Sequence, residues 1–305
     1  MPKTPLFLRK QPGGVYIATN EAYSPGSYFF VHSGTGTDGA GYGRNPDAPL
    51  ATVDYAVGLC TASKADTIFV MPGHAETISG ASSMVLDVAG VKVVGIGHGT
   101  LKPVFTFSAT ASILSITAAN CWVENIRLLS DIDNCVTAIS LGASADGCVL
   151  KNIEILDGAT NKEFLIDVAI AAACHDVTID NLRVFGLAGG ATAAIVTAGA
   201  SNNLAIVNSM VQGTFSTALM DLSAAAIVNL TLANNLCGNR DSGAGLVYKG
   251  HATSTGIASN NRFGGVKNNT ETVSQPGTVM WFENYGTDTA GTTGILTPAT
   301  VTAWS

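Results

Sequence analysis

The stretch CWVENIRLLS at residues 121–130 is repeated as CVLKNIEILD at 148–157, VTIDNLRVFG at 177–186 and LAIVNSMVQG at 204–213. Two looser copies follow, LTLANNLCGN at 230–239 and GIASNNRFGG at 256–265. The fifth residue of every copy is an asparagine, and successive copies are 27, 29, 27, 26 and 26 residues apart. A fixed period of this size is typical of a solenoid. The six asparagines are Asn125, Asn152, Asn181, Asn208, Asn234 and Asn260.

Apolar residues alternate with other residues on both sides of each asparagine, as Cys121, Val123, Ile126 and Leu128 do in the first copy. A period of two predicts a strand with one buried face on either side. The alternation changes phase at the asparagine, which predicts a bend where Asn adopts a left-handed backbone. A third apolar segment separates the copies, at 111–116, 136–141, 164–169, 192–197 and 216–222. Three strands per repeat predict an all-β protein, a right-handed three-sheet parallel β-helix of about seven or eight coils spaced by roughly 4.8 Å.

This pattern resembles the pectate-lyase-like β-helix superfamily, in which stacked asparagines at one turn form an internal hydrogen-bonded ladder. The resemblance covers residues 28–285, which we expect to form a single domain, and it implies that the six asparagines are the structural ladder. For activity as a pectate lyase, the resemblance would require clustered Asp and Glu residues that hold calcium, with Arg or Lys as the base. The tripeptide Gly97-His98-Gly99 matches one motif of the polygalacturonase-like enzymes, but the DD and RIK motifs that accompany it there are absent.

The segment 28–58 predicts the start of the domain. A short strand at 28–32 leads into a glycine-rich turn, and a helix is expected over about 50–60, with an apolar stripe at Val53, Ala56, Val57 and Cys60. Because a β-helix has an open end, this helix is expected to cover it. The segment is similar to the opening of β-helix proteins from tailed bacteriophages and bacterial surfaces, at Ser33, Gly34, Gly36, Asp38, Asn45, Pro46, Pro49, Thr52 and Ala56.

The two ends of the chain differ from the repeats. Residues 1–27 predict an extended N-terminal arm, and residues 286–305 predict a tail rich in Thr and Gly. Both contain isolated apolar residues that a partner would cover. These candidate attachment residues are Val15, Tyr16, Ile17, Tyr23, Ile295, Leu296 and Trp304.

The composition argues against several classes of protein. Only 12% of the residues are charged, the net charge is −7 and Lys plus Arg number 15, so a nucleic-acid-binding surface is not expected. No apolar run reaches the roughly 18 residues of a membrane span, and the first ten residues lack the apolar core of a secretory signal. The six cysteines fit strand positions. Cys121 and Cys148 are close enough in register to invite a disulfide, but small buried thiols are favoured over either a disulfide or a zinc site.

No residue set predicts catalysis, a metal site or a cofactor. The best carboxylate pair, Asp131 and Asp133, falls in a turn where solvated Asp is common. Charged residues flanking the asparagines form two columns of alternating sign, Glu124, Lys151 and Asp180 in one and Arg127, Glu154 and Arg183 in the other. Such columns fix strand register at roughly 0.2–1 kcal/mol for each pair.

Three function classes remain. Stretches rich in Ala at 171–173, 191–200 and 218–226 suggest lateral packing of identical chains about a threefold axis, although Ala also fills narrow β-helix corners. We expect a bacteriophage virion protein: a homotrimeric decoration or cement protein on the capsid surface that binds the major capsid protein. The alternative is a tailspike-type protein that binds or cuts a polysaccharide, with a glycan as partner. A bacterial surface binding module is the third, and fold alone does not decide among them.

Overall fold

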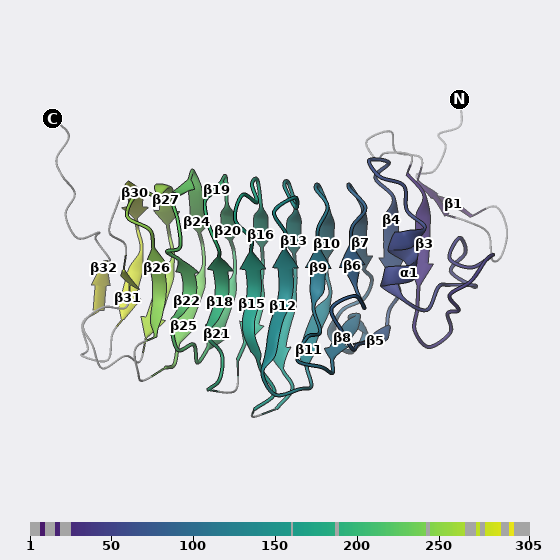
Figure 1. Cartoon of the computed structure of the whole chain (residues 1–305), viewed down its shortest axis with the longest axis horizontal. Coiled ribbons are helices and arrows are strands. Elements are labelled where there is room, and N and C mark those ends of the chain that lie inside the picture. The colour runs from purple at the N-terminus through teal and green to yellow at the C-terminus, as the bar shows by residue number, and fades with distance from the viewer. Residues whose placement is uncertain are drawn as a thin grey trace.

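The structure of the protein is a computed structural model, which describes residues 7–9, 16–18, 26–159, 161–186, 189–241, 245–265, 273–274, 278–287 and 293–295. Parallel strands wind into one long solenoid whose coils are stacked along the horizontal axis of Figure 1. The prediction of an all-β, right-handed three-sheet parallel β-helix is confirmed.

Each coil contributes one strand to each of three sheets, so strands that are consecutive in the chain belong to different sheets. The first sheet consists of β3 (Tyr28–Val31), β4 (Thr67–Val70), β7 (Lys92–Gly95), β10 (Trp122–Glu124), β13 (Val149–Lys151), β16 (Thr178–Asp180), β20 (Ala205–Val207), β24 (Leu230–Ala233), β27 (Thr255–Ser259) and β30 (Thr278–Phe282). The second sheet consists of β5 (Ala75–Ile78), β8 (Val104–Phe107), β11 (Arg127–Ser130), β14 (Glu154–Asp157), β17 (Arg183–Phe185), β21 (Met210–Gly213), β25 (Leu236–Asn239), β28 (Arg262–Gly265), β31 (Tyr285–Thr287) and β32 (Thr293–Ile295). The third sheet consists of β6 (Val85–Leu86), β9 (Leu114–Ile116), β12 (Cys135–Leu141), β15 (Phe164–Ile170), β18 (Ala193–Thr197), β22 (Ala218–Leu222), β26 (Leu246–Gly250) and β29 (Val273–Ser274).

Two small sheets lie outside these three. One is the antiparallel hairpin of β1 (Phe7–Arg9) and β2 (Tyr16–Ala18), and the other joins β19 (Ser201–Asn202) to β23 (Ile227–Val228) at a corner of the solenoid. The strand β32 runs antiparallel to β31, whereas the other neighbours in the three large sheets are parallel. Sequence periodicity did not identify β5, because its apolar residues are too few to stand out.

The core is filled by aliphatic columns that run along the solenoid. The inward residues of neighbouring coils are in register, as Val123 is with Leu150 and Leu128 is with Ile155, and these residues are almost completely buried. Large aromatic side chains occur near the far end, where Trp281 packs on the buried Tyr248 with ring centroids 5.6 Å apart. Bulky rings therefore pack against each other within the last coils.

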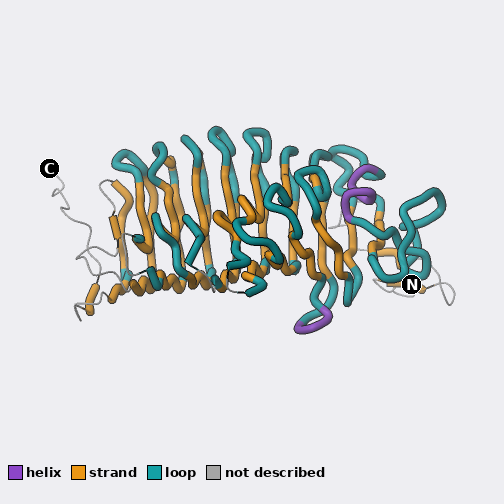
Figure 2. Tube along the Cα trace, turned by 60° about the horizontal axis from the view of Figure 1, so that its bottom comes forward, coloured by secondary structure: helices purple, strands orange, loops and turns teal. Residues whose placement is uncertain are grey.

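The predicted cap helix is confirmed as α1 (Val53–Gly58), which is shorter than the expected range of about 50–60. Its N-cap is Thr52, and Val53, Ala56 and Val57 turn into the core. In Figure 2 this helix lies at the end of the solenoid that holds the first coils, as a cover over the exposed core is expected to do. A second helical turn, the 3-10 helix Gly99–Leu101, projects from a loop between β7 and β8.

The structure corrects part of the interpretation of the alanine-rich stretches. Ala191, Ala193, Ala194 and Ala218 are at most 4% exposed in the single chain. They fill the interior of the third-sheet side, so they cannot contact another copy. The alternative reading of Ala as a filler of narrow β-helix corners holds for these four.

Candidate functional site

The six repeated asparagines all occupy one corner, between the first and second sheets, which we call the asparagine corner. Each has a left-handed backbone, with φ between 53° and 59°. Three amide-to-amide hydrogen bonds run along the column, from Asn181 Nδ2 to Asn152 Oδ1 at 2.7 Å, from Asn234 Nδ2 to Asn208 Oδ1 at 3.2 Å and from Asn260 Nδ2 to Asn234 Oδ1 at 2.8 Å. The Nδ2 groups of Asn152 and Asn208 donate to the carboxylates of Glu124 and Asp180. The first of them, Asn125, instead donates to the carbonyls of Gly95 and Gly97. This column faces solvent in part, so it is an outer ladder.

A second, fully buried ladder lies one residue later along the chain. The column begins as Ile126, Ile153 and Leu182 and then changes to polar residues. Asn261 is 0% exposed, and its Nδ2 donates to Leu232 O and to Asn284 Oδ1 at 2.9 and 2.8 Å. Its Oδ1 accepts from the backbone N–H and from Nδ2 of the preceding member of the ladder. The members of this buried ladder are Ser209, Asn235, Asn261 and Asn284.

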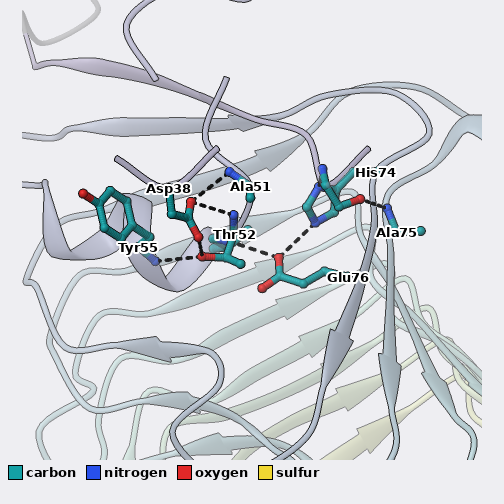
Figure 3. Close-up of polar contacts among 9 residues, drawn as sticks. Asp38, Ala51, Thr52, Tyr55, His74, Ala75 and Glu76 are labelled. Atoms are coloured by element: carbon teal, nitrogen blue, oxygen red, sulfur yellow. Dashed lines mark hydrogen bonds and ion pairs between the residues drawn. The ribbon is translucent and has the colours of Figure 1, made fainter. Parts of the chain in front are cut away.

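A polar cluster surrounds the start of α1 (Figure 3). The carboxylate of Asp38 accepts hydrogen bonds from the backbone N–H groups of Ala51 and Thr52 and from the Thr52 hydroxyl, at 2.8, 3.2 and 2.8 Å. The Thr52 hydroxyl oxygen in turn accepts from the N–H of Tyr55 and caps the helix. Gly36 lies against this loop, where an added Cβ would approach Leu50 O to 2.1 Å. The glycine and acidic residues of the opening segment are thus explained by folding of the cap.

A histidine and a glutamate lie beside this cap, and their arrangement first suggests a catalytic pair. His74 is 1% exposed, and its Nδ1 accepts a hydrogen bond from the backbone N–H of Ser33 at 3.0 Å. The proton therefore sits on Nε2, which donates to Glu76 Oε2 at 3.0 Å. The Ser33 hydroxyl accepts a hydrogen bond from Ala75 N, and in the described part of the chain no hydrogen bond joins it to the imidazole, so the geometry lacks an activated nucleophile. This cluster holds the first coil to the cap.

The third polar feature is an acidic corner between β14 and β15. Glu163 and Asp167 are each 3% exposed, and Glu163 Oε2 and Asp167 Oδ2 have no hydrogen-bond partner within the described residues. Burial raises the pKa of the Glu163 carboxyl, and the charges of Asp133 and Asp157 raise it further. Burial also raises the pKa of Asp167, with a contribution from Asp157. These two carboxyls are therefore held in the neutral form to a higher pH than ordinary acids. Sequence reasoning missed them because neither belongs to a motif.

The other carboxylates singled out by the sequence lie on the surface nearby. Asp131 forms an ion pair with Lys162, and Asp133 accepts a hydrogen bond from Asn134 Nδ2 at 2.6 Å. Both are exposed turn residues. Gly97-His98-Gly99 is also a turn, with left-handed or positive φ at both glycines and an exposed histidine. Neither set forms a pocket lined by opposed carboxylates.

The alternating charge columns are confirmed as register neighbours. Arg127 is paired with Glu154 across β11 and β14, and their side chains approach to 2.9 Å. Lys102 reaches the same carboxylate at 3.2 Å, and burial lowers the pKa of its ammonium although Glu154 opposes the shift. Burial alone would raise the pKa of Glu154, but Arg127 and Lys102 hold it below its usual value. These ions stabilise the stack of coils.

The cysteines are free thiols, and five of the six are buried. Cys121 and Cys148 stack in adjacent coils, directly before strands that pair Trp122 with Val149. Burial raises the pKa of Cys135 to about 11, which makes its thiol a poor nucleophile. Among the described residues, no three His, Cys, Asp or Glu side chains are placed to hold a metal ion.

The candidate attachment residues fall at the two ends. Tyr16 and Ile17 belong to β2, in register with Arg9 and Leu8, and Ile295 belongs to β32, in register with Tyr285. In Figure 1 β1 and β32 lie at opposite ends of the long axis. Val15, Tyr23, Leu296 and Trp304 lie outside the described residues.

Comparison with known proteins adds no family. No family model, no curated protein and no solved structure matches the chain. Within the described residues, the helices are all too short or too polar to span a bilayer.

Proposed function

We propose that this chain is a structural protein of a tailed-bacteriophage virion, a homotrimeric decoration or cement protein that lies on the capsid surface. Its partner is the major capsid protein, which it binds through its terminal segments, and the solenoid body is the rigid part that stiffens the shell. No cofactor takes part.

The observation that carries this proposal is the construction of the opening segment. The residues that resemble the start of phage β-helix proteins build the cap: Asp38 bonds the loop before α1, Thr52 caps the helix, and Gly36 permits close backbone approach. The polar groups in this cap and in the His74–Glu76 cluster are occupied by hydrogen bonds within the chain. An opening segment whose polar groups are committed to folding suits a building block.

Immunogold labelling tests the location. Antibodies raised against the recombinant chain are applied to intact particles of the phage that carries this gene, and label on the head surface is expected. Label confined to tail fibres or spikes, or none on particles that contain the chain by mass spectrometry, contradicts the proposal. Adding recombinant chain to heads that lack it should raise the temperature at which they rupture.

The acidic corner favours the alternative, a tailspike-type protein acting on a polysaccharide. Glu163 and Asp167 have raised pKa values, and a neutral carboxylic acid is what a glycoside hydrolase uses as general acid. Their burial argues against this use, because both are 3% exposed and a glycosidic oxygen has to reach the acid. Release of reducing ends or unsaturated products from a panel of neutral and acidic polysaccharides, abolished by Glu163→Gln, would support the alternative.

A further inference from the structure

The residues on the two sides of the asparagine corner are matched coil by coil. In each coil one side chain directly before the corner points outward from the first sheet, and one side chain two residues after it points outward from the second sheet. We call the two a corner pair. Over the middle coils each corner pair carries opposite charges: Glu124 with Arg127, Lys151 with Glu154, and Asp180 with Arg183.

Within one chain these opposite charges do not meet. The two side chains of a corner pair lie on faces that diverge from the corner, and no ion pair joins them in the described part of the chain. Arg127 pairs with Glu154 of the following coil instead, and Arg183 is exposed. The match across the corner therefore does not stabilise the single chain directly.

Most of the later coils continue the match with apolar residues in place of charged ones. Leu236 is 38% exposed, Phe282 53% and Tyr285 49%, which is high for large apolar side chains on a sheet. Ile257 and Met280, paired in β27 and β30, are 43% and 47% exposed on the first sheet. Three of the four later corner pairs are apolar with apolar: Val207 with Met210, Ala233 with Leu236, and Phe282 with Tyr285. The fourth is Ser259 with Arg262, in the coil between the last two of these.

Because exposed apolar residues lie on both faces of one corner, two neighbouring copies of the chain are needed to cover them. A flat contact between two copies would cover one face and leave the other exposed. A contact between two different faces is heterologous, and it gives each copy one neighbour on either side when the rotation closes into a ring. If the copies are parallel and at the same height, the first-sheet member of each corner pair meets the second-sheet member of the same pair on the next copy. The charged members of the three pairs at residues 124–183 then each meet an opposite charge.

We propose that copies of this chain form a parallel ring in which the outer face of the first sheet of one copy packs on the outer face of the second sheet of the next. This rests on the self-association in the proposed function and assigns its surface. Apolar contacts between the last coils supply most of the attraction, and the charges at residues 124–183 set orientation and height. The charge match matters because each chain carries a net charge of −7, which repels its copies.

Engineered cysteines test the contact in the full-length chain. Two differently tagged chains in a Cys60→Ser background, one with Ala233→Cys and the other with Leu236→Cys, are co-expressed and exposed to copper phenanthroline. A disulfide between the two tags is expected, with at least about tenfold less product when only one of the two cysteines is present, because each face meets the other and not itself. Leu236→Cys co-expressed with Thr217→Cys, which lies directly before the third-sheet strand β22, is the matched control and is expected to give no cross-link.

Charge variants test whether neighbouring copies in the ring lie at the same height, so that equivalent coils face each other. Arg183→Glu should raise the concentration of half-dissociation at least about tenfold by sedimentation velocity, and adding Asp180→Arg should restore it to within about threefold. Circular dichroism shows whether each variant folds. An assembled wild type without the Ala233–Leu236 cross-link, or a cross-link between two copies of Ala233→Cys, overturns the proposed contact and leaves the proposed function standing. A monomeric wild type at micromolar concentration overturns both this contact and the trimer, whereas attachment to the capsid is measured separately by labelling.

Discussion

Replacing Asn261 separates the buried ladder from the outer one, because its chain neighbour Asn260 belongs to the outer column. Asn261 is 0% exposed and makes four side-chain hydrogen bonds within the described residues. In Asn261→Ala the backbone N–H of Asn235 and the carbonyl of Leu232 lose these partners inside the core. An orphaned buried polar group costs about 1–3 kcal/mol. With two such groups, and with the Oδ1 of Asn284 also losing a donor, we expect a loss of about 3–5 kcal/mol.

Asn260→Gly is the matched control. It removes one hydrogen bond at an exposed site, to Asn234 Oδ1, and glycine adopts the φ of 53° without strain. The expected loss is below about 1 kcal/mol. Asn260→Ala should cost more than Asn260→Gly, since a left-handed backbone costs an alanine roughly 1–2 kcal/mol.

Urea unfolding followed by circular dichroism gives the free energies, and hydrogen exchange locates the damage. Because coils contact only their neighbours, part of the loss is expected as fraying of the last coils, so global unfolding by itself understates it. The amide of Asn235 should exchange at least about a hundredfold faster in Asn261→Ala, which corresponds to about 2.7 kcal/mol, and little faster in Asn260→Gly. Equal losses from the two substitutions, or unchanged protection at Asn235, would refute the assignment of the buried ladder.

Three further predictions test other parts of the chain. Asp167→Asn should be at least as stable as the wild type at pH 7, and its advantage should shrink toward pH 4. The reason is that the pKa of Asp167 is raised in the folded protein. The wild-type carboxyl therefore contributes fully to stability below the unfolded pKa of about 3.9, where it is neutral, and this contribution is lost as the pH rises through the folded pKa. Melting temperatures of both proteins across pH 4–8 check this, and parallel curves would contradict it. Asp38→Ala should lower stability by about 1–3 kcal/mol, measured by urea unfolding, because three donors at the start of α1 lose their acceptor in a partly solvated site. Deleting residues 1–27 should leave the circular dichroism spectrum of the β-helix intact but abolish capsid attachment in a cosedimentation assay; an unfolded truncation would count against an attachment arm.

The repeat in the sequence predicted the architecture because each structural requirement recurs about every 27 residues. The outer asparagines, the aliphatic columns and the charge columns could all be predicted, since a left-handed corner, an inward position and a register neighbour each select a residue type. The cap helix could be predicted in the same way from its apolar stripe and its N-cap. By contrast, β5 was missed, because the segment Ala75–Ile78 buries a glutamate where other coils bury an aliphatic residue.

The buried features depend on which side of a corner a residue faces. Asn234 and Asn235 are neighbours of the same type in the chain, and so are Asn260 and Asn261, yet only the second of each pair turns inward. Likewise, nothing in the sequence distinguishes Glu163 and Asp167 from exposed loop and strand residues. Only the packing of the coils excludes water from their carboxyl groups.

The sequence by itself determined the period, the number of strands in a coil and the left-handed corner, because these are local properties of backbone and side-chain type. The tertiary structure decided which amides form the internal ladder, which carboxyls are buried without partners and which alanines are hidden in the core. It also decided that residues 180 and 183 face apart within one chain. Each of these depends on the direction in which a coil closes upon its neighbours, and no single repeat contains that information.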